Sequence, residues 1–78
     1  MPSIEVDGFR LIVNSRDERG HRPHVHVVRG RSKVVIMLDS TLALHRLHRM
    51  RRPDVVRARE LVARHLDQLT EWWRTYNE

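Results

Sequence analysis

The chain has 78 residues, no cysteine and a formal net charge of +5, from 15 lysine and arginine residues against 10 aspartate and glutamate residues. This length fits a single domain over residues 1–78 with a small core. The absence of cysteine excludes disulfides and thiolate metal sites. No apolar run is long enough to span a membrane, and residues 1–7 do not resemble a signal peptide. We therefore expect a cytoplasmic protein with no membrane interaction.

The first two thirds of the chain predict an antiparallel sheet. Runs rich in valine, isoleucine and other strand-forming residues predict strands at residues 9–14, 24–28, 33–38 and 41–45. A polar loop over 14–23 separates the first two. The later connections are short, which favours pairing of consecutive strands in a meander. The continuous apolar run at 33–38 indicates a strand that is buried on both faces.

The last third predicts one helix over residues 53–76. Pro53 suits the first turn, where its missing N–H leaves no hydrogen bond unmade, and Asp54 places a carboxylate where the helix dipole favours it. A single apolar stripe follows, formed by Val55, Val62, Leu66, Leu69, Trp73 and Tyr76. The predicted fold is therefore α+β: an antiparallel three- to four-stranded meander followed by one long C-terminal helix packed on the sheet. Trp73 is expected in the core, and Trp72 at a partner interface or stacked on a base.

Three histidines are candidates for chemistry. His24 and His26 are two residues apart, so on a strand both side chains point to one face, roughly 7 Å apart. They could act as an acid–base pair, share a metal ion, or be half-buried structural residues. His21 extends the pattern to His-x-x-His-x-His, but zinc sites use three or four ligands and no clear further ligand lies nearby. His65 flanks the apolar stripe, where it could bond to backbone or reach the strand histidines.

The segment His45–Arg52 has four arginines and no carboxylate. These side chains could contact phosphates, bind an acidic partner or form a solvated basic surface. Together with the arginines that flank the strand histidines, the candidate nucleic-acid-binding residues are Arg22, Arg29, Arg46, Arg49, Arg51 and Arg52. The sequence lacks a Gly-rich phosphate loop, a nucleophile elbow and a cysteine nucleophile. Any catalysis would therefore use histidine acid–base chemistry or a metal ion.

These motifs resemble a family of small bacterial proteins known as domain of unknown function 4160. Asp17 followed by Pro23-His24-Val25-His26-Val27 is similar to the family's Asp-His-x-Pro-Pro-His-x-His, although Glu18 stands where the family has a histidine. Ala63-Arg64-His65-Leu66-Asp67, with the later Leu69 and Trp73, is similar to its Ala-x-His-x-Asp…Leu…Trp pattern. The resemblance covers nearly the whole chain. It implies antiparallel strands with a C-terminal helix, membership of two-gene operons suspected to be toxin–antitoxin modules, and a site that joins His65 to His24 and His26.

Two hypotheses about function follow. In the first, the chain is the basic component of such a module, the toxin, which binds RNA and cleaves it as a metal-independent ribonuclease without a cofactor. His24, His26 and His65 would be catalytic, and the partners would be a cognate small acidic protein and RNA, with a homodimer also compatible. In the second, the same three histidines bind zinc or a similar ion in a non-catalytic metal-binding or protein-interaction domain. An antitoxin role is a third reading, which the arginine excess disfavours.

Overall fold

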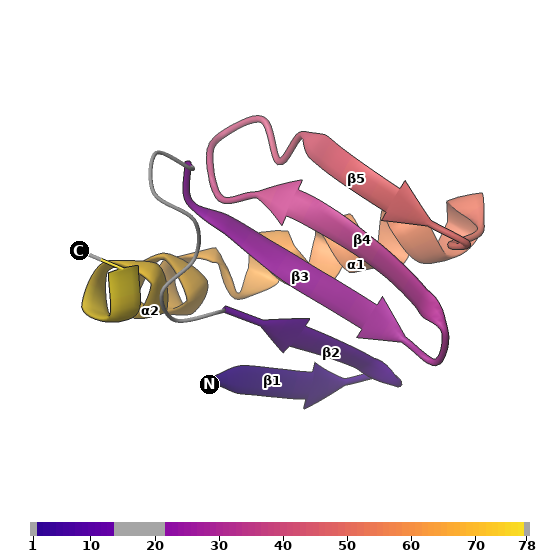
Figure 1. The fold of residues 1–78 in the computed structure, drawn as a ribbon, viewed down its shortest axis with the longest axis horizontal. Coiled ribbons are helices and arrows are strands. Elements are labelled where there is room, and N and C mark those ends of the chain that lie inside the picture. The colour runs from indigo at the N-terminus through magenta and orange to yellow at the C-terminus, as the bar shows by residue number, and fades with distance from the viewer. Residues whose placement is uncertain (1, 14–21, 78) are drawn as a thin grey trace.

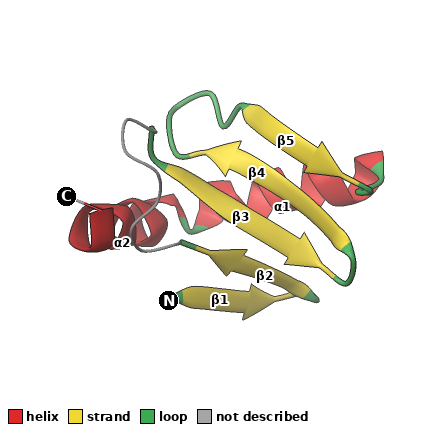
Figure 2. Cartoon of the chain, viewed as in Figure 1, coloured by secondary structure: helices red, strands yellow, loops and turns green. Residues whose placement is uncertain are grey.

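The computed structural model describes residues 2–13 and 22–77. Within these ranges, a five-stranded antiparallel sheet has the strand order β1-β2-β3-β4-β5 and is followed by two helices. The elements are β1 (Ser3–Val6), β2 (Phe9–Ile12), β3 (His24–Arg29), β4 (Ser32–Met37), β5 (Leu44–His48), α1 (Arg52–Arg64) and α2 (Leu66–Asn77). Both helices lie behind the sheet in Figure 1, and α2 continues past its end (Figure 2). The predicted α+β class and the meander are confirmed.

The number of strands was predicted wrongly because β1 gives only a weak local signal. It has four residues, and Ile4 and Val6 are half-buried. The strand forms by pairing with β2 through the two-residue turn Asp7-Gly8, whose φ angles are 52° and 80°. Positive φ at both central residues is typical of the hairpin turn that Asp-Gly favours. This dipeptide is the signal from which β1 could have been predicted.

The fourth predicted strand, residues 41–45, is also wrong in its position. Asp39 Oδ1 accepts hydrogen bonds from the Thr41 N–H, the Thr41 hydroxyl and the Leu42 N–H, at 2.9, 2.6 and 3.0 Å. These bonds stabilise a turn over residues 39–42, in which Leu42 has a φ of 50°. The chain therefore begins its last strand at Leu44, and β5 ends at His48.

The single long helix of the sequence prediction is divided at His65. This residue leaves the helical conformation, with φ −106° and ψ 18°, and separates α1 from α2. Its N–H donates to the carbonyl of Leu61, and its own carbonyl accepts from the N–H of Leu69, so hydrogen bonding continues across the break. Because the apolar stripe also runs across it, and neither glycine nor proline marks it, the periodicity predicts one helix. None of the described helices is long and apolar enough to cross a membrane.

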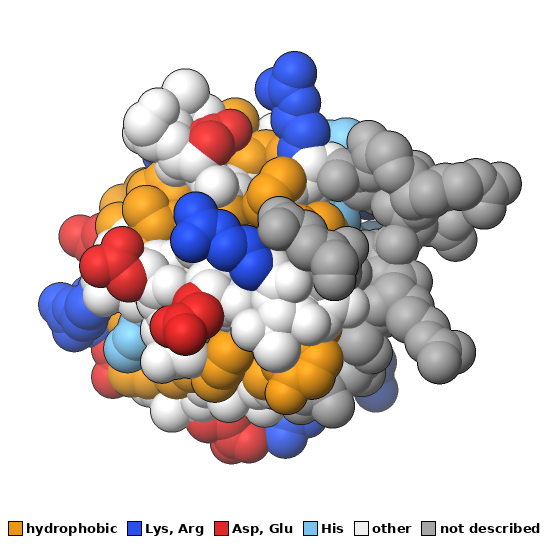
Figure 3. Space-filling model, turned by 90° about the vertical axis from the view of Figure 1, so that its left-hand side faces the viewer, with side chains coloured by type: hydrophobic (Ala, Val, Ile, Leu, Met, Phe, Trp, Pro, Cys, Tyr) orange, Lys and Arg blue, Asp and Glu red, His pale blue; other side chains and the backbone are white. Residues whose placement is uncertain are grey.

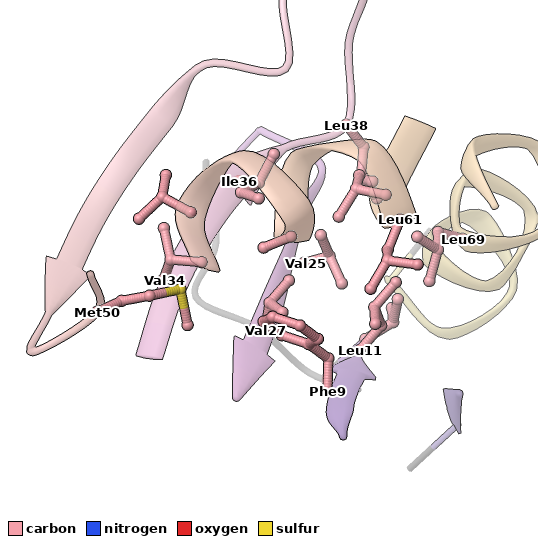
Figure 4. Close-up of a cluster of buried hydrophobic side chains, with 14 of the residues drawn as sticks. Phe9, Leu11, Val25, Val27, Val34, Ile36, Leu38, Met50, Leu61 and Leu69 are labelled. Carbon is pink, nitrogen blue, oxygen red and sulfur yellow. The ribbon is translucent and has the colours of Figure 1, made fainter. Parts of the chain in front are cut away.

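The core lies between the helices and one face of the sheet (Figure 4). Val25 and Val27 alternate along β3 and are fully buried there, as a strand with one covered face requires. Trp73 is 6 % exposed, which confirms its predicted core position, and Trp72 is half-buried against the same cluster. Tyr76, predicted on the stripe, is instead 47 % exposed near the end of α2.

Candidate functional site

The two strand histidines lie on the outer face of the sheet, which is the face opposite the helices. Side chains alternate along β3, so the positions of His24 and His26 are on the face opposite Val25 and Val27, although the His24 ring also reaches Trp73 of α2 at the end of the sheet. The strand register then defines their neighbours. His26 pairs with Ile12 of β2 and with Val35 of β4, and His24 pairs with Met37 of β4. Val35 also pairs with Arg46 of β5, which brings a cation to the same face.

These side chains surround a pocket of about 540 Å³, called here the histidine pocket. It combines three imidazoles and two guanidinium groups with apolar side chains from β4. Its lining residues are Arg22, His24, His26, Val35, Met37, Ala43, Leu44, His45 and Arg46. A cavity with apolar walls and a few convergent polar groups is the usual form of a ligand site. The groups present here suit an anionic ligand that exchanges protons.

His24 is held from two sides. Its side chain is 6 % exposed, and its Nδ1 lies 2.8 Å from the carbonyl oxygen of Arg22. Because a carbonyl oxygen only accepts, Nδ1 donates the proton in this hydrogen bond. The ring also packs against Trp73 of α2, with centroids 4.9 Å apart. This contact and the hydrogen bond orient the imidazole.

The rings of His24 and His26 lean toward each other. Their centroids are 5.2 Å apart with an interplanar angle of 67°, closer than the roughly 7 Å spacing of alternate positions along a strand. Both imidazoles can therefore contact one small group.

Arg22 brings positive charge to one side of the histidine pocket. The pKa of Asp39 is lowered mainly by the hydrogen bond from the Thr41 side chain, and the charge of Arg22 also contributes to lowering it. The adjacent residue Pro23 accepts a hydrogen bond from the N–H of Leu38 at 2.9 Å, which ties this segment to the end of β4. Arg22 is therefore placed by the same backbone contacts that hold the start of β3.

The remaining candidate arginines lie in three places. Arg46 lines the histidine pocket, whereas Arg49, Arg51 and Arg52 continue along the chain from β5 into α1 and are exposed. Arg29 lies elsewhere: it pairs with Asp54 at 3.5 Å and its guanidinium lies 5.0 Å from the centre of the Phe9 ring. On the end of the molecule that contains α2, acidic and basic side chains are interspersed (Figure 3). Among the described residues, the segment from β5 to the start of α1 carries four arginines with no carboxylate between them.

His65 lies at the junction of α1 and α2, and the described residues that line the histidine pocket do not include it. Over residues 2–13 and 22–77, no three histidine or carboxylate side chains are grouped as a metal site would require. Asp17, Glu18 and His21 are outside the described residues, as are Asn14 and most of the predicted loop that follows it.

The sequence did not predict the wall of the pocket that β5 supplies. His45 was grouped with the basic segment, and Val35 and Met37 were assigned only to a buried strand. Their meeting with His24 and His26 depends on the pairing of β4 with β3 and β5, including a register shift between Val35 and Ile36. Alternation along the predicted strand 33–38 places Val35 and Met37 on one face of that strand. This was the available signal that they line a common surface.

The fold and the pocket define a small α+β domain whose sheet presents imidazole and guanidinium groups on the face opposite its helices. Residues 8–74 match the model of the family described as Domain of unknown function (DUF4160), and the chain belongs to this family. The family resemblance noted from the histidine motifs is thereby confirmed. No curated protein and no solved structure matches the chain.

Proposed function

We propose that this protein is the basic component of a toxin–antitoxin type two-gene module, and that it binds RNA in the histidine pocket and cleaves it. The observation that carries the proposal is the meeting of His24 and His26, 5.2 Å apart, with Arg22 and Arg46 in one pocket. Imidazoles supply a base and an acid near neutral pH, and guanidinium groups bind phosphate with two parallel hydrogen bonds. An RNA phosphodiester with its 2′-hydroxyl is a ligand that uses both.

The reaction needs two proton transfers and no other reactant. His24 accepts the proton of the 2′-hydroxyl as that oxygen attacks phosphorus. The bond from phosphorus to the 5′-oxygen breaks, and protonated His26 donates a proton to this leaving oxygen. The products are a 2′,3′-cyclic phosphate and a free 5′-hydroxyl. Arg22 and Arg46 stabilise the charge that develops on the phosphate oxygens.

The arginines beyond the pocket extend the binding surface. Arg49, Arg51 and Arg52 follow Arg46 in sequence, are exposed, and have no carboxylate between them. Side chains in such a row can contact successive phosphates of a single strand, and each contact adds a salt-dependent part to the affinity. Arg29 contributes less in this proposal, because its guanidinium is engaged by Asp54 and the Phe9 ring.

Replacement of the pocket histidines tests the proposal. Purified His26→Ala and His24→Gln variants should lose cleavage of a single-stranded RNA by roughly 100-fold or more, since acid–base groups contribute at least that much. Expression of each variant should no longer arrest growth. His48→Ala is the matched control, because His48 is exposed on β5 and lies outside the pocket. Unaltered cleavage by the His26→Ala variant would refute the assignment of His26.

Three further measurements control the variants and separate this proposal from the zinc alternative. Cleavage should persist with a chelator, and each variant should keep the far-ultraviolet circular dichroism of the folded protein. Protein purified without a histidine tag should contain no stoichiometric zinc. Zinc that is bound at one ion per chain and lost in the His65→Ala variant would instead support a metal-binding domain that uses His24, His26 and His65.

A further inference from the structure

The strand β5 forms one edge of the sheet, and all five of its residues are exposed. It pairs with β4 on its inner side, and no described element runs along its outer side (Figure 1). An edge strand of this kind presents backbone N–H and C=O groups that another extended segment can bind. The edge formed by β1 differs, because Ile4 and Val6 on it are half-buried.

The two faces of β5 have different chemistry. Leu47 pairs with Val34, and a register shift of one residue lets Leu44 pair with Ile36. Residues that pair across strands share a face of the sheet. Leu44, beside the register shift, also lines the histidine pocket, whereas Leu47 extends the core face. They are 46 % and 55 % exposed, and Val56 on α1 is 53 % exposed. Arg46 instead pairs with Val35, on the outer face beside the histidine pocket.

The charge along this edge has one sign. From Ser40 to Pro53 there are four arginines, two histidines and no carboxylate. Charged residues on edge strands also protect proteins against aggregation. That protective role explains the arginines, but it does not explain two leucines that are half exposed on the same edge. Apolar and cationic groups together indicate a binding surface for a segment that carries apolar and acidic side chains.

A second copy of this chain would bring the same excess of arginine and histidine to this edge. Antiparallel pairing of two β5 strands about their central residue would place Arg46 opposite Arg46 and each leucine opposite a histidine. Like charges directly opposite each other destabilise a strand pair. The charge therefore favours a different, acidic occupant.

We propose that an extended acidic segment of a partner protein adds to β5 as a further antiparallel or parallel strand of the sheet. Apolar and acidic residues alternate in this segment. Its apolar side chains pack beside Leu44 and Leu47, and its carboxylates face Arg46 on the outer face. Backbone hydrogen bonds supply affinity and the alternating side chains supply specificity, as in other cases of strand addition.

Docking of this segment has a consequence for the histidine pocket. Leu44, His45 and Arg46 belong both to β5 and to the pocket lining. A partner strand on β5 would therefore neutralise Arg46 and compete with RNA for the basic segment. This regulatory consequence rests on the proposed function, whereas the docking itself does not.

A synthetic peptide in which valine and glutamate alternate tests the docking. When this peptide is titrated into the isotope-labelled protein, the backbone amide NMR signals of β5 should shift. The affinity of the protein for the peptide should fall as the salt concentration is raised. Two modified peptides are compared with it: one carries backbone N-methyl groups on its valines, and the other carries them on its glutamates. Because only one edge of the added strand faces β5, one modified peptide should bind like the parent and the other should lose binding by about tenfold or more.

Two protein variants test whether the peptide binds beside Arg46. Arg46→Glu should weaken binding of the parent peptide by about tenfold, whereas Arg74→Glu, which changes an exposed arginine on α2, should leave it unchanged. Equal binding of both N-methylated peptides would overturn the inference, since attraction would then be electrostatic only. Absence of binding, or a concentration-dependent dimer through β5, would also overturn it. RNA binding measured in parallel is independent: peptide binding without RNA binding refutes the proposed function alone, and the reverse refutes the docking alone.

Discussion

The ring of His24 packs against the ring of Trp73, with centroids 4.9 Å apart and an interplanar angle of 52°. His24 begins β3, whereas Trp73 lies in α2, behind the sheet. The pairing of β2 with β3 ends at Ile12 and His26, so His24 lies past the end of β2, where its ring reaches the indole. The second helix therefore takes part in orienting an imidazole of the histidine pocket.

Removal of the Trp73 ring should destabilise the protein and disturb the pocket together. The Trp73→Ala variant is expected to lose about 3–5 kcal/mol of unfolding free energy, because the indole is 6 % exposed and leaves a cavity. Trp72→Ala should lose less, since Trp72 is only half-buried. Urea unfolding followed by circular dichroism measures both. Equal losses in the two variants would contradict the role given to Trp73, and Trp73→Phe, which keeps an aromatic ring, should recover part of the loss.

Much of the fold follows from local patterns in the sequence. The valine-rich strands β3 and β4 and the helix start at Pro53 and Asp54 were predictable, because strand preference and helix capping depend on neighbouring residues. The break at His65 was not predictable in this way. It leaves the apolar stripe in register and involves a residue with no strong preference for ending a helix. The contacts of α2 with the sheet, which include Trp73 against His24, are long-range.

The candidate site divides in the same way. Alternation along one strand places His24 and His26 on one face, so this pair was predictable. The position of Arg46 opposite Val35 depends on the turn at Asp39 and on the register shift between β4 and β5. A change of one residue in that register would turn Arg46 to the other face. The expectation that His65 joins the pair came from its position beside the apolar stripe and from the family motif, and it remains a prediction.

The two arginines of the pocket should each reduce the salt dependence of RNA binding when they are removed. Each phosphate contact contributes about 0.7 to the slope of log affinity against log salt for a single strand. Arg46→Ala and Arg22→Ala should therefore lower the slope by roughly that amount each. Arg64→Ala is the matched control, because Arg64 is exposed in the last turn of α1 and outside the pocket. Fluorescence anisotropy of a labelled RNA across a salt series gives the slopes, and an equal change in all three variants would argue against a localised site.

Arg49 gives a case in which stability and RNA binding should change in opposite directions. Its φ is 55°, a left-handed conformation that is unfavourable for side chains other than glycine. Arg49→Gly should raise the unfolding free energy by about 0.5–1 kcal/mol, since the Ser32 hydroxyl can still donate to the residue 49 carbonyl. It should weaken RNA binding through loss of one cation.

Arg51→Gly is the control for this change. Arg51 has an extended backbone, with φ −73° and ψ 154°, so glycine relieves no strain there. Both variants lose one arginine from the basic segment. Urea unfolding should show a larger gain for Arg49→Gly than for Arg51→Gly, which changes the N-cap residue of α1, while both reduce RNA affinity. A loss of stability in Arg49→Gly would show that the left-handed conformation carries no strain that glycine can relieve.

The turn beside the pocket should make a pH-dependent contribution to stability. The hydrogen bond from the Thr41 side chain, together with the backbone bonds from Thr41 and Leu42 and the charge of Arg22, holds the pKa of Asp39 below its usual value of 3.8. A carboxyl whose pKa is lowered by folding stabilises the folded state fully above its unfolded pKa, and loses this contribution as pH falls through its folded pKa. Asp39→Asn should therefore unfold at lower urea than the parent at neutral pH, and the difference should shrink below about pH 3.8.

Thr41→Val separates the carboxylate from its principal hydrogen-bond donor. This variant keeps Asp39 and the Leu42 N–H but lacks the hydroxyl that donates at 2.6 Å. The pKa of Asp39 should then rise toward its usual value, and the acid-dependent part of the stability difference should decrease without disappearing. Urea midpoints of the three proteins between neutral and acidic pH give the comparison. A difference between the parent and Asp39→Asn that does not change with pH would show that the ionised carboxylate does not stabilise the turn.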